Sequence, residues 1–86
     1  MPTLAYAHHQ LRFHRDAAMP ESDLRALLAQ HGFSVANLSY NLTGDGKFFE
    51  YGMIIRSLDA ENVQRLAHTL TNLAAVIEFR IAPTGD

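Results

Sequence analysis

The chain has 86 residues, a formal net charge of −2 and no cysteine. A chain of this length builds one hydrophobic core, the lack of cysteine excludes disulfides and thiolate metal sites, and the lack of a Lys/Arg run argues against nucleic-acid binding. With 48% hydrophobic residues but no apolar stretch that could span a bilayer, residues 1–86 are expected to form a single soluble domain that does not insert into a membrane.

The first element is a predicted strand over residues 6–14, where apolar and polar side chains alternate with a period of two. The side chains expected on its apolar side are Ala7, His9, Leu11 and Phe13.

A helix follows, with Pro20 expected as its first residue and Gly32 ending it in a left-handed conformation. Its apolar stripe is Leu24, Leu27, Leu28 and His31.

Residues 33–42 predict a second strand whose alternation changes phase near Ala36, which indicates a bulge or kink. Val35, Leu38, Tyr40 and Leu42 are expected on its apolar side, and Asn37, Ser39 and Asn41 in water. The run 43–47 contains Gly44 and Gly46 and predicts a tight hairpin, because glycine adopts the positive φ angles that such turns need.

The third strand then covers residues 47–57. It places Phe49, Tyr51, Met53 and Ile55 on one side and Phe48, Glu50, Gly52, Ile54 and Arg56 on the other.

Asp59 is expected to cap a second helix, because aspartate side chains accept the free N–H groups at helix starts. Its apolar stripe is Val63, Leu66, Ala67, Leu70 and Ala74, with Glu61, Asn62, Gln64, Arg65 and His68 off that stripe. From Ala75 the period returns to two and predicts a fourth strand that ends at Pro83 and Gly85. Its two sides are Ile77, Phe79 and Ile81, and Val76, Glu78, Arg80 and Ala82.

The order strand, helix, strand, strand, helix, strand predicts an α+β domain of the ferredoxin-like class. In this arrangement a four-stranded antiparallel sheet has the strand order 4-1-3-2. Right-handed crossovers place both helices on one face of the sheet and leave the other face open.

No group of residues in the sequence predicts a catalytic reaction. Two of the five histidines, His8 and His14, lie about 20 Å apart along one strand, and the others offer no spacing typical of a zinc site. Glu50 and Glu78 are expected on the open face, where pairing with arginines is the usual role of such residues. We therefore predict no catalytic residue, no metal ligand and no cofactor, and a chain that is not an enzyme.

Phe48, Ile54 and Val76 are apolar residues expected on the open face of the sheet. If they are contiguous, Phe48 and Ile54 mark an interaction face. The alternative is that they are scattered apolar residues of the kind that every protein surface carries. The outer edge of the second strand is a further surface available for association.

The element order, the helix opening at residues 20–24 and above all the final segment 77–86, IEFRIAPTGD, resemble the C-terminal domain of the MgtC/SapB family. The likeness covers essentially the whole chain. In that family a soluble ACT-like domain follows a bundle of transmembrane helices, and the proteins are associated with growth in low magnesium and survival of bacterial pathogens inside macrophages. The resemblance implies that residues 1–86 belong to the C-terminal end of a larger membrane protein, on the cytoplasmic side of the cell membrane.

The resemblance also implies a non-catalytic regulatory domain whose partner is its own transmembrane part, another protein, or a second copy in a homodimer. The alternative is an ACT-type sensor that binds an amino acid or ion at the loop after the first strand, near Asp16. ACT-like domains often use an aspartate followed closely by glycine there. This chain has Ala17 and Ala18 instead, whose side chains hinder a close approach of the backbone to a ligand.

Overall fold

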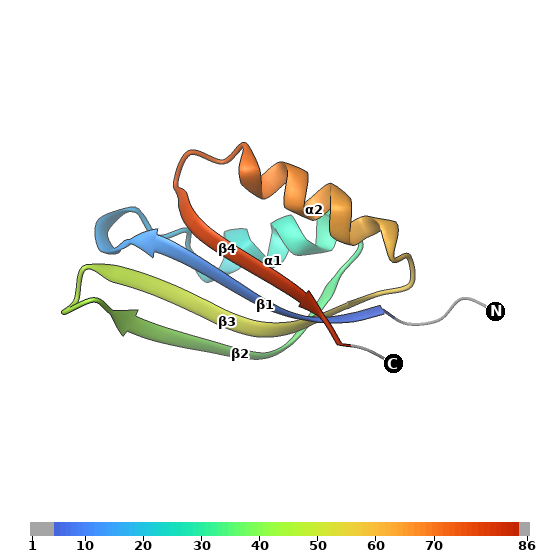
Figure 1. The fold of residues 1–86 in the computed structure, drawn as a ribbon, viewed down its shortest axis with the longest axis horizontal. Coiled ribbons are helices and arrows are strands. Elements are labelled where there is room, and N and C mark those ends of the chain that lie inside the picture. The colour runs from blue at the N-terminus through green and yellow to red at the C-terminus, as the bar shows by residue number, and fades with distance from the viewer. Residues whose placement is uncertain (1–4, 85–86) are drawn as a thin grey trace.

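Two helices lie side by side on one face of a four-stranded antiparallel sheet (Figure 1). The computed structural model describes residues 5–84. The elements are β1 (Ala5–His14), the 3-10 turn η1 (Arg15–Ala17), α1 (Glu21–Gln30), β2 (Ser34–Thr43), β3 (Phe48–Ser57), α2 (Glu61–Thr71) and β4 (Val76–Pro83). The sheet order β2-β3-β1-β4 is the predicted order 4-1-3-2 read from the opposite edge, so the α+β, ferredoxin-like prediction is confirmed.

The core lies between the sheet and the helices, and its composition follows from the alternation in the central strands β1 and β3. Every second residue of each central strand points at the helices, because side chains alternate between the two faces of a sheet. The fully buried side chains of the core are those of Leu11, Phe13, Leu24, Leu28, Ile55, Leu66, Leu70 and His9. The predicted apolar sides of β1 and β3 are therefore confirmed.

β2 contains the predicted irregularity, and the β2–β3 connection is the predicted hairpin. The register of β2 against β3 shifts between Ala36 and Ser39, and Asn37 between them has a φ of 54°. In the hairpin, Gly44 and Gly46 both have positive φ, and the N–H of Lys47 donates to the carbonyl of Gly44 at 3.1 Å. The phase change seen in the sequence is a local bulge, and β2 pairs with β3 both before and after it.

The ends of α1 correct one detail of the sequence prediction and confirm another. Pro20 precedes the helix in an extended conformation, with φ −61° and ψ 149°, and the first helical residue is Glu21. At the other end, the N–H of Phe33 donates to the carbonyl of Leu28 at 2.9 Å and the N–H of Gly32 to that of Ala29 at 3.0 Å. With Gly32 at φ 83°, this is a Schellman motif, as the predicted left-handed end requires.

A second bulge changes the phase of β4, so the expected sides of Val76 and Ile77 are wrong. Arg12 pairs with Glu78 but Phe13 pairs with Val76, which leaves Ile77 without a partner on β1. Val76 therefore packs against the core, whereas 42% of the surface of Ile77 is exposed. One extra residue in a strand moves its neighbours to the opposite face, and the sequence of β4 alone carries no sign of it.

α2 also departs from the predicted stripe at two residues. Asn62, expected off the apolar stripe, is buried, whereas Ala74, expected on it, lies beyond the end of the helix and is exposed. The N-cap residue is Ala60, and Asp59 before it accepts the N–H of Glu61 at 2.9 Å, so the predicted aspartate serves the first turn from one residue earlier than an N-cap. Among residues 5–84, no helix has both the length and the apolarity needed to cross a membrane.

Candidate functional site

The open face of the sheet carries Phe48 and Ile54 on β3, as expected, but they are not neighbours. Both are half-buried, and Glu50 and Gly52 lie between them on the same face, so the two side chains are about 20 Å apart along the strand. Val76, the third residue expected there, packs in the core instead. The structure therefore places two separate apolar positions on this face.

An ionic cluster lies between these two positions. Arg12 on β1 pairs with Glu50 on β3 and with Glu78 on β4, at 3.1 Å in each case. The Arg12 guanidinium also lies 5.5 Å from the centre of the Phe48 ring, within the range of a cation–π contact. The predicted pairing of the two glutamates with arginine is confirmed. The centre of the open face is thus charged, with one arginine shared between two glutamates.

The outer strand β2 has the more exposed apolar side chains. Tyr40 and Leu42 are 54% and 53% exposed, although they lie on the side of the sheet that the helices cover. They remain exposed because α1 does not extend over this corner of the sheet. The Tyr40 hydroxyl donates to Glu21 in the first turn of α1, and this bond together with Arg25 lowers the pKa of the Glu21 carboxyl.

Two aromatic residues of the neighbouring strand β3 pack against Tyr40. The Tyr40 ring centre lies 5.8 Å from that of Tyr51 and 6.3 Å from that of Phe49. Tyr51 is buried, its hydroxyl donates to the carbonyl of Met19 at 2.6 Å, and burial raises its pKa. The Tyr40–Leu42 corner is therefore an apolar surface on a rigid base.

The loop after β1, where an ACT-type sensor would bind its ligand, holds Asp16 in an exposed position within η1. Its carboxylate makes no hydrogen bond to any residue between 5 and 84. The neighbouring Arg15 fixes the loop to the hairpin, since its backbone N–H donates to the carbonyl of Lys47 at 3.0 Å. Within the described chain, no three His, Cys, Asp or Glu side chains come together as metal ligands.

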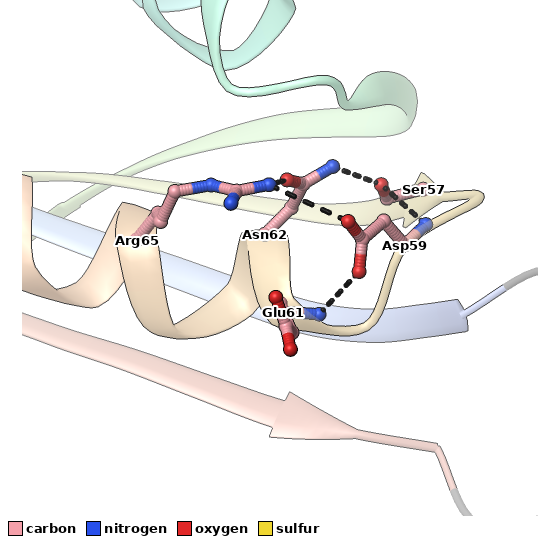
Figure 2. Close-up of polar contacts among 5 residues, drawn as sticks. All are labelled: Ser57, Asp59, Glu61, Asn62 and Arg65. Carbon is pink, nitrogen blue, oxygen red and sulfur yellow. Dashed lines mark hydrogen bonds and ion pairs between the residues drawn. The ribbon is translucent and has the colours of Figure 1, made fainter.

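A network of polar side chains joins the end of β3 to the first turns of α2 (Figure 2). The Asn62 amide donates to the Ser57 hydroxyl at 2.7 Å, and Arg65 donates to the Asn62 carbonyl oxygen. Arg65 also pairs with Asp59 at 3.6 Å. Asn62 can be buried because both ends of its amide are bonded, which satisfies the polar groups that burial removes from water.

Gly32, at the end of α1, lies directly against this network. A Cβ atom at Gly32 would stand 2.5 Å from the Asn62 amide nitrogen, so only glycine leaves room for it. The sequence prediction missed this contact because Asn62 was placed off the apolar stripe of α2. The signal available was Ser57 two residues before the Asp59 cap, since serine and aspartate near a helix start commonly organise its first turn.

A groove of about 680 Å³ separates this part of α2 from the C-terminal end of α1. One wall consists of Gln30, His31 and Gly32, and the other includes Asn62, Arg65 and His68. At one point the helices are bridged by His31, whose Nδ1–H donates to the carbonyl of Leu27 and whose Nε2 accepts the Thr69 hydroxyl, both at 2.8 Å. The groove is thus a solvent-open gap between two helices that pack on the sheet, lined by residues with polar side chains and by Gly32.

His9 is a buried polar residue in the core. Its Nδ1–H donates to the carbonyl of Arg80 on β4 at 2.9 Å, whereas its Nε2 has no hydrogen-bond partner within the described residues. Burial lowers the pKa of His9 below its ordinary value, against the opposing effect of the bond to Arg80. The neutral ring therefore connects β4 to β1 from inside the core.

Two solved domains share this architecture over nearly the whole chain. The C-terminal domain of the MgtC protein from Mycobacterium tuberculosis aligns with a TM-score of 0.69 over 94% of this chain and 88% of that chain, at 14% identity. The ACT domain of the GTP pyrophosphokinase from Chlorobium tepidum aligns with a TM-score of 0.67 over 92% and 99%, at 10% identity. The chain has the ACT-like fold.

The predicted likeness to the MgtC C-terminal domain is thus confirmed at the level of the fold, with Gly85 and Asp86 of the final segment outside the described residues. The de novo designed protein Foldit4 also aligns, with a TM-score of 0.52 over 98% of this chain and 99% of its own, at 14% identity. No family model and no curated protein sequence matches the chain. Because the ACT-like fold also occurs in a protein designed from scratch, function must be argued from particular surfaces.

Proposed function

We propose that this chain is a non-catalytic regulatory domain that acts by docking through the outer edge of β2. The observation that carries the proposal is the ten-residue strand Ser34–Thr43, which has a neighbour on one side only and contains neither a charged residue nor a proline. Such an edge offers unpaired backbone N–H and C=O groups to another strand.

Tyr40 and Leu42 would add the apolar part of this contact. Burying one side chain of this size contributes roughly 1.5–3 kcal/mol, and a symmetric contact between two copies would use each side chain twice. The partner we propose is therefore a second copy of the chain, with the two β2 strands adjacent. Another protein, or a transmembrane part of the same protein, is an alternative partner for the same edge. The experiment below distinguishes these partners from a second copy of the chain.

For the cellular setting, we propose the cytoplasmic, C-terminal domain of an MgtC-like membrane protein linked to growth in low magnesium and to survival of a bacterial pathogen inside host cells. The support for this setting is the fold shared with the M. tuberculosis MgtC C-terminal domain over most of both chains. The pairing of Glu50 and Glu78 with one arginine supports a non-catalytic role, because such pairs across a sheet are ordinarily structural.

Sedimentation velocity over a range of protein concentrations tests the docking edge. We expect a concentration-dependent dimer that Leu42→Lys weakens by about tenfold or more, because it places a charge at the contact and removes apolar area. The matched control is Ile77→Lys, which changes an exposed apolar residue on β4, the opposite edge. A monomer at every concentration would exclude the second copy as partner, and equal weakening by both variants would exclude β2 as the specific contact.

The open face is the alternative docking surface, and the same measurement separates it from β2. Phe48→Asp or Ile54→Asp would weaken a dimer formed through the open face and would leave a β2-edge dimer unchanged. Association that falls with these two variants, and not with Leu42→Lys, would transfer the proposal to the open face around Phe48 and Ile54.

An ACT-type sensor is the second candidate function, and the observation that favours it is the exposed, unbonded carboxylate of Asp16 in the loop after β1. Amide NMR spectra recorded with millimolar magnesium and with a panel of amino acids test it. Saturable shifts around Asp16 that disappear in Asp16→Asn would support a sensor of an amino acid or ion. Spectra unchanged by every compound would leave protein docking as the function.

A further inference from the structure

The groove between the end of α1 and α2 has the dimensions of a small-molecule site. Its volume of about 680 Å³ lies within the roughly 300–1,000 Å³ that is typical of ligand pockets. It lies at the end of the molecule where α1 ends and α2 begins, whereas Asp16 lies at the other end of β1, next to the hairpin. It is therefore distinct from both the sensor loop and the Tyr40–Leu42 corner.

The charge of the groove favours an anion. Arg65 is the formally charged residue among those that line it, and no carboxylate lines it in the part of the chain that the structure describes. Asp59 pairs with Arg65 from outside the groove, and because these side chains are 54% and 59% exposed the pair is weak, so Arg65 can exchange it for another anion. The carbonyls of Leu28 and Ala29 are occupied by the Schellman bonds, which weakens the repulsion that a helix C-terminus exerts on an anion.

The Arg65 guanidinium is held in place and still has donors to offer. Its contacts with Asn62 and Asp59 are both made by Nη2, so the N–H groups on Nε and Nη1 have no partner among residues 5–84. Asn62 is fixed in turn by the buried hydroxyl of Ser57. An arginine positioned in advance loses less side-chain entropy when it binds, which strengthens its contact with an oxyanion.

His68 lies one turn further along α2, on the same side of the helix as Arg65. Asn72 lies 3.4 Å from its Nε2 and donates to its backbone carbonyl at 2.9 Å. The Nδ1 of His68 has no hydrogen-bond partner within the described residues, so it can donate to a ligand in the tautomer in which Nε2 accepts. On the opposite wall, the Gln30 side chain can donate its amide N–H groups.

We propose that this groove binds a small molecule that carries a carboxylate or phosphate group, with Arg65 as the main contact to the anion and His68 as a second donor. The proposal is independent of docking through β2, because the groove and the outer edge of β2 share no lining residue. It gives the chain a ligand site at the opposite end from the loop used by ACT-type sensors.

Amide NMR titrations with inorganic phosphate and with glutarate, at constant ionic strength, test the site in the wild type, Arg65→Gln and Arg25→Gln. Arg25 is the matched control because it is also a surface arginine on a helix that pairs with a carboxylate, Glu21 at 2.9 Å. We expect saturable shifts around Gln30, Gly32 and His68, weakened about tenfold in Arg65→Gln and unchanged in Arg25→Gln.

Gln30→Glu provides a second variant that leaves the Arg65 network intact. It adds a carboxylate to the facing wall and is expected to weaken binding of both anions several-fold with an otherwise unchanged spectrum. Saturable binding of phosphate alone, or of glutarate alone, identifies which of the two anion classes the groove accepts. Shifts that fail to saturate with either anion, or that persist equally in Arg65→Gln and Gln30→Glu, would overturn the proposal.

Discussion

β2 and β4 are the two outer strands of the same sheet and each contains a bulge, yet β4 alone also carries charged residues and a proline, which discourage pairing with another chain. β4 contains Glu78, Arg80 and Pro83, whereas β2 contains no charged residue and no proline. Charges and proline on an outer strand are common means of preventing edge-to-edge association. The two edges are therefore not equivalent, and we assign the docking edge to β2 for this reason.

The two outer strands also differ in how the rest of the domain holds them. β4 is connected to the core by His9, whose ring donates to the carbonyl of Arg80 from inside. β2 is connected by groups near the surface, such as the Ser39 hydroxyl, which donates to the carbonyl of Gly52 at 3.1 Å. Both strands pack apolar side chains against the core, but β4 has in addition a side-chain hydrogen bond from a buried residue.

Removing the charges from β4 should make the two edges more alike, with Pro83 still in place, and produce the largest effect. In the double variant Glu78→Thr with Arg80→Thr, both edges would be open, and we expect assemblies larger than a dimer, because a chain with two open edges can add partners without end. Sedimentation velocity measures the size distribution. The matched control is Glu50→Thr with Arg56→Thr, which removes the same charges from the inner strand β3. Large assemblies in both variants, or in neither, would contradict the comparison.

Gly32→Ala should destabilise the connection that leads from α1 into β2. The substitution places a side chain at φ 83° and a Cβ atom 2.5 Å from the Asn62 amide nitrogen. We expect a loss of about 2 kcal/mol or more in the free energy of unfolding, from backbone strain and a displaced hydrogen bond.

Urea denaturation measures this loss, and Gly52→Ala is its control. Gly52 has no positive φ, and its Cβ would meet only the Ser39 hydroxyl at 3.0 Å. We expect this variant to change stability by no more than about 1 kcal/mol. Equal losses in the two variants would mean that the contact between Gly32 and Asn62 has no special role.

Acidification should act on β4 through His9. Because the pKa of His9 is lowered in the folded state, its stabilising contribution is fully present above the unfolded value of 6.5 and is lost as the pH falls below it. The slope of the free energy of unfolding against pH cannot exceed about 1.4 kcal/mol per pH unit for one proton.

Urea denaturation at pH values on both sides of 6.5 measures this slope, which should be reduced in His9→Leu and kept in the control His14→Leu, at an exposed position. Hydrogen exchange should show that β4 loses protection before β2 as the pH falls, because His9 bonds to the backbone of β4. An unchanged slope in His9→Leu would exclude His9 as the titrating group.

Tyr40→Phe should have the smallest effect, because it removes one exposed hydrogen bond beside the open edge. Without the Tyr40 hydroxyl, the pKa of Glu21 is expected to rise towards its ordinary value. NMR titration of the Glu21 carboxyl carbon measures the shift. Arg25→Gln serves as comparison and should also raise the pKa of Glu21, since Arg25 lowers it by a hydrogen bond and by its charge, although the hydrogen bond from Tyr40 is the larger of the two hydrogen-bond effects. A pKa that rises in Arg25→Gln and stays unchanged in Tyr40→Phe would assign the depressed pKa to the arginine.

The sequence predicted the elements and their order because each level of local pattern agreed with the same fold. The alternation in β1 and β3, the glycines of the hairpin and the left-handed end at Gly32 are local signals, and the structure confirms them. The bulge at Ile77 depends on the register of β4 against β1, which is a property of two strands. A period read along one strand therefore assigned Val76 and Ile77 to the wrong sides.

The candidate surfaces were less accessible to sequence analysis for a related reason. Tyr40 and Leu42 follow the apolar alternation of β2, and their exposure results from where α1 begins relative to the edge of the sheet. The groove depends on the spacing of two helices that are more than thirty residues apart in the chain. Residue types indicate which side chains can form an apolar or charged contact. The packing of helices and strands decides which of these side chains remain exposed to a partner or ligand.

The pairing of β1 with β4 has a mechanical consequence. The N–H of Thr84 donates to the carbonyl of Tyr6 at 2.9 Å, so the start of β1 and the end of β4 lie together, as Figure 1 also shows. A tensile force applied at Tyr6 and Thr84 would separate two antiparallel neighbours from the same end and break their hydrogen bonds one after another. The domain should therefore yield to stretching at low force, by unzipping β4 from β1 while β2 and β3 remain paired.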